Sequence, residues 1–399
     1  MGMEHTGPLR GIRVLELSLA LTGPYIGALF ADQGADVVKV ERPDIGDILR
    51  WIGPSVNGLS AVFRVCNRGK KSIAVDVRTD TGRQIALELA AQADVVIQNF
   101  RPGVADRLGV GYDDVVAINS EVVYVSLTGF GEIGPYRDRS AYDTVIQAYG
   151  GVASSQAAPD VGEPIFLQQV LADKVTALYA SQAVTAALFA RATGRGGQHV
   201  HVSMVDAVVS FLWTDAAGNE VLLDSDNSQP SSFTSGFKPF RFIDGWGVVT
   251  PISDSDFTGM CRALDAPGAD DPRLQTAELR NQHRPLMAEV MAACYAGAEK
   301  LTVDQATERF EAADVPYAMI VPPEELPDDP HAIAMGLFEE RDDPVVGRVR
   351  IPRHPALFDG TPARLAGPAP KLGEHTEEIL AQVGRVGQGS GLRDSGVIA

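Results

Sequence analysis

Short apolar runs alternate with helical patterns through the first third of the chain, and this alternation restricts the fold more than any other feature. Strands are predicted at 12–17, 36–40, 72–77, 94–98 and 122–127, and helices at 23–33 and 81–91. Strands that alternate with helices form parallel βαβ units with right-handed crossovers. The sequence therefore predicts an α/β domain built on a parallel sheet.

Two stretches of distinctive composition divide the rest of the chain. A polar, serine-rich stretch at 219–237 is predicted to be a linker, and a Pro- and Asp-rich stretch at 322–330 a connector. The predicted domains are the N-terminal part of a large domain at 1–218, a small α+β domain at 238–321, and a C-terminal part at 331–399. The elements predicted after the first sheet are a loop at 128–140, a helix at 142–148, a strand or extended segment at 168–171, a helix at 174–193, a strand at 199–203, a helix at 204–211, a hairpin at 239–250, helices at 254–264, 283–295 and 303–312, and in the tail one strand and a closing helix.

The charge balance excludes several partners. The chain has 52 acidic and 34 basic residues, which gives a net charge of −18. Nucleic acids and anionic membranes attract clustered Lys and Arg side chains, so this balance argues against both. The chain contains no apolar run long enough to cross a bilayer. We therefore expect a cytoplasmic protein with no nucleic-acid or membrane partner.

The cysteines and histidines are too scattered to indicate a disulfide scaffold or a zinc site. Cys66, Cys261 and Cys294 lie far apart in the chain and suit a reducing compartment. His199 and His201 share one face of a predicted strand, where polar packing is favoured over a two-ligand metal site. No metal is predicted.

A G-x-G-x-x-G pattern at Gly129, Gly131 and Gly134 resembles a dinucleotide-binding motif. That motif needs a helix to begin at its last glycine, so that the helix N-terminus faces the pyrophosphate. Here Pro135 and a charged loop follow at once, and the first strand-to-helix turn, at 18–27, lacks the three glycines. The sequence therefore does not favour NAD or FAD binding.

The segment 61–72 is basic within an acidic chain. It contains Arg64, Arg68, Lys70 and Lys71 and no acidic residue. Clustered cations of this kind suit a small polyphosphate ligand. A solvated basic loop without a ligand is the equally simple alternative.

Asp173 lies at the predicted start of the long alanine-rich helix. It can be an N-cap, or a carboxylate that the helix dipole keeps ionised and available as a nucleophile, and the two roles are compatible. Tyr142 and Asp143 begin the preceding helix. Helix capping and aromatic packing are enough to explain both residues without a catalytic role.

A series of short motifs resembles, in sequence and in order, the family III CoA-transferases, which include formyl-CoA and carnitine CoA-transferases and the 2-methylacyl-CoA racemases. The motifs lie at 8–15 with 23–24, at 34–41, 67–72, 99–103, 129–131 with 134–135, 193–198, and 372–376. The resemblance implies a Rossmann-like large domain to which the tail returns, a smaller α+β domain, and a homodimer whose chains interlock. It also implies coenzyme A and acyl-CoA as substrates, a carboxylic acid acceptor, and no permanently bound cofactor.

The resemblance assigns roles to individual residues. Asp173 matches the catalytic aspartate, which would carry CoA through an aspartyl anhydride and an aspartyl-CoA thioester. The residues that fall on segments contacting CoA or the thioester are Leu19, Ala20, Leu21, Arg42, Lys70, Asn99, Phe100, Arg101, Arg107 and Tyr142. Backbone N–H groups of the glycine loop, residues 129–134, are expected to stabilise the tetrahedral oxyanion.

The sequence also departs from the family pattern. Leu21 stands where formyl-CoA transferases carry a glutamine, and the glycine run of the oxalate-using members is absent near 233–247. Both departures disfavour formate and oxalate. Succinyl-CoA is a family-level expectation for the donor. Lys238 and Arg241 are read as surface charges rather than contacts for a second carboxylate.

Two alternatives stay open. A 2-methylacyl-CoA racemase needs two bases, and Tyr142 stands where the racemases carry a histidine; tyrosine is a poor base at neutral pH. A subunit that binds CoA thioesters without turnover is the other alternative, against which the presence of Asp173 argues.

Overall fold

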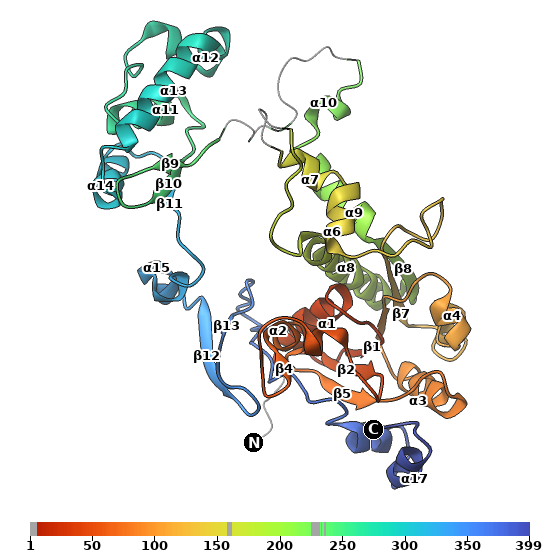
Figure 1. The fold of residues 1–399 in the computed structure, drawn as a ribbon. Helices are drawn as coiled ribbons and strands as arrows, with labels where there is room; N and C mark the ends of the chain where they lie inside the picture. Colours follow the sequence, from red (N-terminus) through yellow and green to blue (C-terminus); the bar gives the residue numbers. More distant parts are fainter. Residues whose placement is uncertain (1–5, 158–161, 225–231, 233, 235–236) are drawn as a thin grey trace. The chain divides into compact units, whose positions relative to one another are not determined.

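The computed structural model describes the chain except residues 1–5, 158–161, 225–231, 233 and 235–236. It divides into two compact units, one formed by 1–221 with 336–399 and the other by 222–335 (Figure 1). Much of the predicted linker at 219–237 lies outside the described residues.

The first unit is built on a six-stranded parallel sheet, as the sequence predicts. Its strands are β1 (Arg13–Glu16), β2 (Asp36–Glu41), β5 (Lys71–Ala74), β6 (Val95–Gln98), β7 (Val123–Thr128) and β8 (Gln198–Ser203), in the spatial order β5-β2-β1-β6-β7-β8. The chain winds outward first through β1, β2 and β5 and then through β6, β7 and β8. The direction reverses between β1 and β6, and such a reversal leaves a crevice at the carboxyl ends of the strands.

Helices cover both faces of this sheet because alternate strand residues point to opposite sides. Val95 and Ile97 pack with α1 (Thr22–Asp32) and α8 (Leu171–Ala190). Val96, between them, packs with α3 (Asp80–Ala90) and α16 (Thr376–Gln382) on the other face. The C-terminal tail therefore completes the core of the first unit.

The remaining helices of the first unit are η1 (Ile48–Trp51), α2 (Ala61–Asn67), α4 (Val104–Leu108), α5 (Tyr112–Val116), α6 (Asp143–Tyr149), α7 (Val152–Ser155), η2 (Arg191–Arg195), α9 (Met204–Trp213), α10 (Gly218–Val221) and α17 (Gly389–Asp394). Two small antiparallel pairs accompany them: β3 (Ser55–Val56) with β4 (Leu59–Ser60), and β12 (Phe338–Asp343) with β13 (Gly347–Pro352). The strand predicted in the tail, at 347–383, is β13, and its partner β12 was not predicted. The segment 168–171, predicted as a strand or an extended segment, is not a strand, and the carbonyl of Gln169 accepts a hydrogen bond from the Gln147 side chain of α6.

The second unit surrounds a three-stranded antiparallel sheet of order β11-β10-β9, made of β9 (Phe240–Arg241), β10 (Trp246–Val249) and β11 (Tyr317–Met319). Its helices are α11 (Asp254–Ala263), η3 (Pro272–Leu274), α12 (Ala277–Gln282), α13 (Arg284–Ala298), α14 (Val303–Ala312), η4 (Leu326–Asp328) and α15 (Pro330–Ala334). Phe257, Phe310 and Cys294 are buried in its core. The hairpin and three longer helices were predicted.

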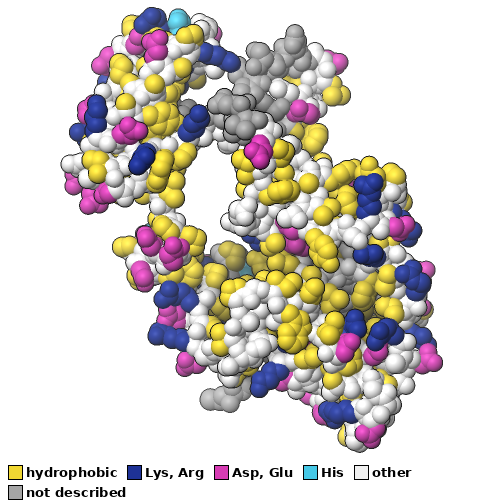
Figure 2. All heavy atoms as spheres, in the orientation of Figure 1, with side chains coloured by type: hydrophobic (Ala, Val, Ile, Leu, Met, Phe, Trp, Pro, Cys, Tyr) yellow, Lys and Arg dark blue, Asp and Glu magenta, His cyan; other side chains and the backbone are white. Residues whose placement is uncertain are grey.

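On the face drawn in Figure 2, acidic and basic side chains are interspersed, with hydrophobic side chains between them. No described helix is both long enough and apolar enough to cross a membrane.

Candidate functional site

The loops that follow β1 and β6 are tied together at the reversal point of the sheet. The backbone N–H of Leu19 donates to Asn99 Oδ1 at 2.9 Å, and Asn99 Nδ2 donates back to the Leu19 carbonyl at 2.6 Å. Ala20 donates its N–H to Asp47 Oδ1 at 3.1 Å and has a φ of 63°, an uncommon conformation for a residue with a side chain. Strained backbone of this kind persists where the surroundings fix it, and it is found preferentially at functional sites.

Asp173 lies directly beside this loop. It is the third residue of α8, with Val170 at the N-cap, so its predicted N-cap role is wrong. The hydroxyl of Thr22, the first residue of α1, donates to Asp173 Oδ1. Asp143, the first residue of α6, accepts the backbone N–H of Asp173 on its Oδ2 at 3.1 Å. Three helix N-termini therefore meet at Asp173.

The surroundings make Asp173 more basic than a solvated carboxylate. Burial raises the pKa of Asp173 to about 6, the negative charge of Asp143 acts in the same direction, and the Thr22 hydroxyl opposes both. A helix N-terminus alone would lower this pKa. Burial outweighs it here, so Asp173 is ionised at neutral pH but poorly stabilised as an anion. A basic, poorly solvated carboxylate is a stronger nucleophile than one in water.

Beneath the loop lies a buried ionic network centred on Glu16. Its two oxygens bind Lys39 Nζ at 2.7 Å and Lys70 Nζ at 2.6 Å, and none of the three side chains is exposed to solvent. Lys39 also donates to the Ser18 carbonyl at 2.7 Å and pairs with Asp47 at 2.9 Å. Burial alone would raise the pKa of Glu16, but the two ammonium groups hold it below its ordinary value.

This network contradicts the expected role of Lys70. Its ammonium is fully used by Glu16, by the Pro24 carbonyl at 2.8 Å and by Asn67 at 2.9 Å. Lys70 faces the protein interior, and burial lowers its pKa to about 8. The geometry therefore does not support a direct contact between Lys70 and CoA.

The expected cationic patch at 61–72 is also corrected. Arg64 pairs with Asp343, and Arg68 pairs with Asp32 at 2.5 Å, with both guanidinium groups buried. Lys71 is half-buried and pairs with Asp36 and Glu378. These basic residues hold the fold together and leave no free cationic surface.

Exposed cations lie instead around Gly103, just after β6, and one of them, Arg137, pairs with Asp138 at 3.7 Å. A side chain at Gly103 would meet Arg107 Nη1 at 3.4 Å and Arg137 Nη2 at 3.9 Å. Arg101 donates to Ser140 Oγ at 2.6 Å. All three arginines are exposed, and within the described residues neither Arg101 nor Arg107 makes an ion pair. We call Arg101, Arg107 and Arg137 the arginine cluster.

A pocket of about 230 Å³ lies at the carboxyl ends of β1, β2 and β5. It brings together three predicted residues, Leu19, Arg42 and Phe100. Its other lining residues are mostly apolar: Leu17, Val40, Val75, Val77, Val104 and Leu108, with Glu41, Asp76 and Arg78. The prediction missed the segment from Val75 to Arg78 as part of the site, because the predicted strand ran to residue 77 whereas β5 ends at Ala74.

A second pocket, of about 290 Å³, lies beside the first at the ends of β6, β7 and β8. In it His199 Nε2 is 2.8 Å from Ser126 Oγ, and the ring of Tyr112 stacks on His199 with centroids 4.3 Å apart. Burial lowers the pKa of His199 to about 4. His201 Nδ1 lies 3.1 Å from a carboxylate oxygen of Glu132. Within the described residues, no group of three or more potential ligands is placed to hold a metal.

The glycine loop packs against α6. Gly131 and Gly134 have φ values of 87° and 88°, which favour glycine. The rings of Phe130 and Tyr149, on the loop and on α6, lie 5.3 Å apart edge to face. The N–H of Gly131 donates to Thr128 Oγ1 at 3.2 Å, so this proposed oxyanion donor is already engaged.

The predicted residues thus fall into three groups. Leu19, Ala20, Leu21 and Asn99 form or hold the loop beside Asp173, with Leu21 buried and Tyr142 exposed at the N-cap of α6. Arg42 and Phe100 line the 230 Å³ pocket, and Arg101 and Arg107 belong to the arginine cluster. Lys70 joins none of these groups.

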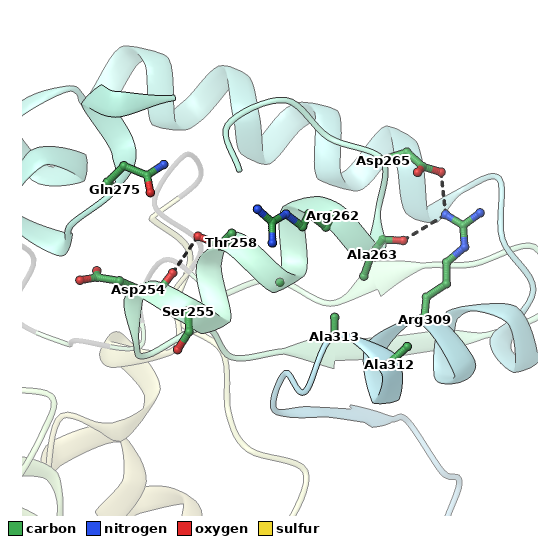
Figure 3. A pocket seen from close by; sticks show the side chains of 11 residues that line it. Asp254, Ser255, Thr258, Arg262, Ala263, Asp265, Gln275, Arg309, Ala312 and Ala313 are labelled. Carbon is green, nitrogen blue, oxygen red and sulfur yellow. Dashed lines mark hydrogen bonds and ion pairs between the residues drawn. The ribbon is translucent and has the colours of Figure 1, made fainter. Parts of the chain in front are cut away.

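The second unit also has a pocket, of about 730 Å³, between α11 and α14 (Figure 3). Its floor consists of small residues, and its charged groups are paired, Arg309 with Asp265 at 2.6 Å and Asp254 with Arg280 at 2.7 Å. It lacks the uncompensated charge and buried carboxylate that mark the first unit.

Comparison with known proteins agrees with the motifs. The family model described as CoA-transferase family III matches residues 9–376 of this chain. The succinyl-CoA:glutarate CoA-transferase of Mus musculus is 32% identical over 98% of this chain and 90% of its own length. The succinate–glutarate CoA-transferase of Agrobacterium fabrum is 33% identical, covering 94% of this chain and 96% of its own. A solved CAIB/BAIF family protein from Brucella suis is 32% identical with a TM-score of 0.81, covering 95% of this chain and all of that one. The chain therefore belongs to CoA-transferase family III.

Proposed function

We propose that this protein transfers CoA from an acyl-CoA donor to a carboxylic acid, with Asp173 as the covalent nucleophile. The observation that carries the proposal is the half-buried, basic Asp173 carboxylate at the meeting point of three helix N-termini. The names of the relatives support succinyl-CoA as donor and a dicarboxylic acid such as glutarate as acceptor.

Each chemical step exchanges one acyl bond and needs no external proton. The Asp173 carboxylate attacks the donor thioester; a C–O bond forms, the C–S bond breaks, and CoA thiolate leaves an aspartyl anhydride. The thiolate attacks the Asp173 carbonyl of the anhydride, so that the donor acid is released and an aspartyl-CoA thioester remains. The acceptor carboxylate then attacks this thioester to give a new anhydride and free thiolate. The thiolate attacks the acceptor's carbonyl, which yields the new acyl-CoA and restores Asp173.

The structure supports separate binding sites for the purine base and for the phosphate groups of CoA. The 230 Å³ pocket has the largely apolar walls that suit a purine ring. The arginine cluster carries exposed positive charge suited to the phosphate groups of CoA. The position of both at the carboxyl edge of a reversing parallel sheet agrees with a Rossmann-like nucleotide site. In this proposal the arginine cluster takes the role that the family resemblance implies for Lys70.

The interlocked homodimer and the cytoplasmic location stay predictions. Exposed hydrophobic side chains on α8 and α9 support an assembly that covers them, because monomers rarely expose such patches. They include Leu178, Phe189, Phe211 and Trp213.

The test is intact-protein mass spectrometry after mixing with succinyl-CoA, glutaryl-CoA and other thioesters, followed by peptide mapping. We expect an acyl or CoA adduct on the Asp173 peptide, and a loss of at least about a thousandfold in transfer rate for Asp173→Asn. Asp206→Asn is a matched control, since Asp206 is also the third residue of its helix and is also bound by a hydroxyl, that of Ser203. An adduct absent from wild type, or unchanged in Asp173→Asn, would overturn the proposal. Exchange of the α-hydrogen for solvent deuterium without transfer would indicate a racemase instead.

A further inference from the structure

Asp143 is a second buried carboxylate that the proposed chemistry does not use. Its exposed fraction is 5%, and both of its oxygens are occupied. Oδ2 accepts the backbone N–H of Asp173 at 3.1 Å, and Oδ1 accepts Gln147 Nε2 at 2.5 Å. Asp143 is therefore held by Gln147 of its own helix, and it accepts a hydrogen bond from the backbone of Asp173.

Gln147 extends this contact to the chain that leads into α8. It is fully buried, its Oε1 accepts the N–H of Leu167 at 3.1 Å, and its Nε2 also donates to the Gln169 carbonyl at 2.9 Å. One turn of α6 thus holds the segment from Leu167 to Asp173. The same helix carries Tyr149, which packs on the glycine loop.

The charged group that acts on Asp173 is negative, like Asp173 itself. Helix α1 presents the neutral hydroxyl of Thr22, α6 presents the carboxylate of Asp143, and α8 contributes its own N-terminus. Among the described residues, Asp143 is the charged group that acts on Asp173, and no Lys or Arg neutralises it there. The contact also occupies an N–H at the start of α8 that would otherwise help to stabilise an anion.

We propose that Asp143, supported by Gln147, is a positioning residue that fixes the start of α8 and keeps a second negative charge beside Asp173. The inference rests on Asp173 being the nucleophile. Because like charges close together favour the protonated form of one of them, Asp143 makes the Asp173 carboxylate more basic. A more basic carboxylate attacks a thioester faster once it is ionised. Asp143 itself does not touch the reacting atoms.

The test compares the pH profile of adduct formation on Asp173 in wild type, Asp143→Asn and Asp143→Glu. Asparagine keeps an oxygen that accepts the Asp173 N–H but removes the charge. We expect its acid limb to move to lower pH by about 0.5 to 1 unit, with a slower plateau rate. Asp143→Glu keeps the charge and should leave the limb near its wild-type position. Asp80→Asn is the matched control, because Asp80 is also the first residue of its helix but is exposed.

The outcomes separate this inference from the function on which it rests. If Asp143→Asn lowers the rate while the limb stays in place, Asp143 is merely structural and the inference is wrong. An acid limb that moves as far in Asp143→Glu as in Asp143→Asn also overturns the inference. Should Asp143→Asn not fold, Asp143→Ser retains a small acceptor without charge and is expected to give the same displacement. A wild-type protein that forms no adduct with any thioester refutes the proposed function itself.

Discussion

Replacing Asp173, the proposed nucleophile, is expected to stabilise the protein at neutral pH and to abolish the proposed transfer. The pKa of Asp173 is raised from 3.8 to about 6, first by burial and then by Asp143. The folded state therefore resists ionising this group, whereas the unfolded chain ionises it freely. Relative to wild type, Asp173→Asn should gain nothing below pH 3.8, gain progressively between 3.8 and about 6, and hold a constant advantage above that range.

The magnitude follows from the size of the shift. A difference of about two pKa units corresponds to about 3 kcal/mol at roughly 1.4 kcal/mol per unit. Asp173 is half-buried, so water screens part of this energy, and the asparagine N–H₂ group needs new partners. We expect Asp173→Asn to be more stable by about 1 to 2 kcal/mol at pH 8, after discounting for screening.

The assay is urea unfolding of wild type and Asp173→Asn, each measured at several pH values between about 4.5 and 8. Many carboxylates titrate over this range, so the informative quantity is the difference between the two proteins at each pH. Since the chain has two compact units, fluorescence and circular dichroism should both be followed to establish which transition moves. The exposed Asp206→Asn is the control for a carboxylate-to-amide change at the third position of a helix. A variant that is less stable than wild type at pH 8, or a gain that does not shrink toward pH 4.5, would refute the reasoning.

Three further predictions concern Thr22 beside Asp173, the buried network of Glu16, and Arg107 of the arginine cluster. Thr22→Val removes the hydroxyl that lowers the pKa of Asp173, so the acid limb of adduct formation should move to higher pH, and Thr22→Ser should restore it. Glu16→Gln leaves the ammonium groups of Lys39 and Lys70 buried with too little negative charge, and thermal unfolding should reveal a loss of about 3 to 5 kcal/mol; a change below 1 kcal/mol would contradict the buried network. Arg107→Ala should raise the KM for acyl-CoA about tenfold with kcat nearly unchanged, as expected for lost uniform binding; steady-state kinetics that show the reverse split would remove Arg107 from the proposed CoA site.

The sheet could be predicted because its information is local. Val95, Val96 and Ile97 are all buried, so β6 reads as a continuous apolar run between turn signals, which is typical of a parallel strand. The segment 168–171 was predicted as a strand or an extended segment, and the carbonyl of its Gln169 accepts a hydrogen bond from the side chain of Gln147, about twenty residues earlier. No local pattern records that partner, so the sequence did not decide between the two structures.

The site was predicted less completely because charges find distant partners. The basic run at 61–72 is visible in the sequence, but its acids lie at Asp32, Glu16 and Asp343. Only the folded chain shows that these cations form ion pairs in the protein interior. The residues from Val75 to Arg78 were missed for the converse reason, since their importance comes from lying at the carboxyl edge of the sheet and not from unusual residue types.

The two buried polar systems of the first unit explain how a poorly stabilised nucleophile can be held in one place. The network of Glu16, Asp47, Lys39 and Lys70 has two negative and two positive charges, and it anchors the strained loop at Ala20, which leads into Thr22. The contacts of α6 do not balance theirs, because Asp143 meets Asp173 without a cation between them. In the proposed mechanism, rigidity is supplied by a neutralised network beneath the site, and reactivity by the pair of Asp143 and Asp173 within it. This separation predicts that variants of Glu16 lose folding stability first, whereas variants of Asp143 change the pH profile first.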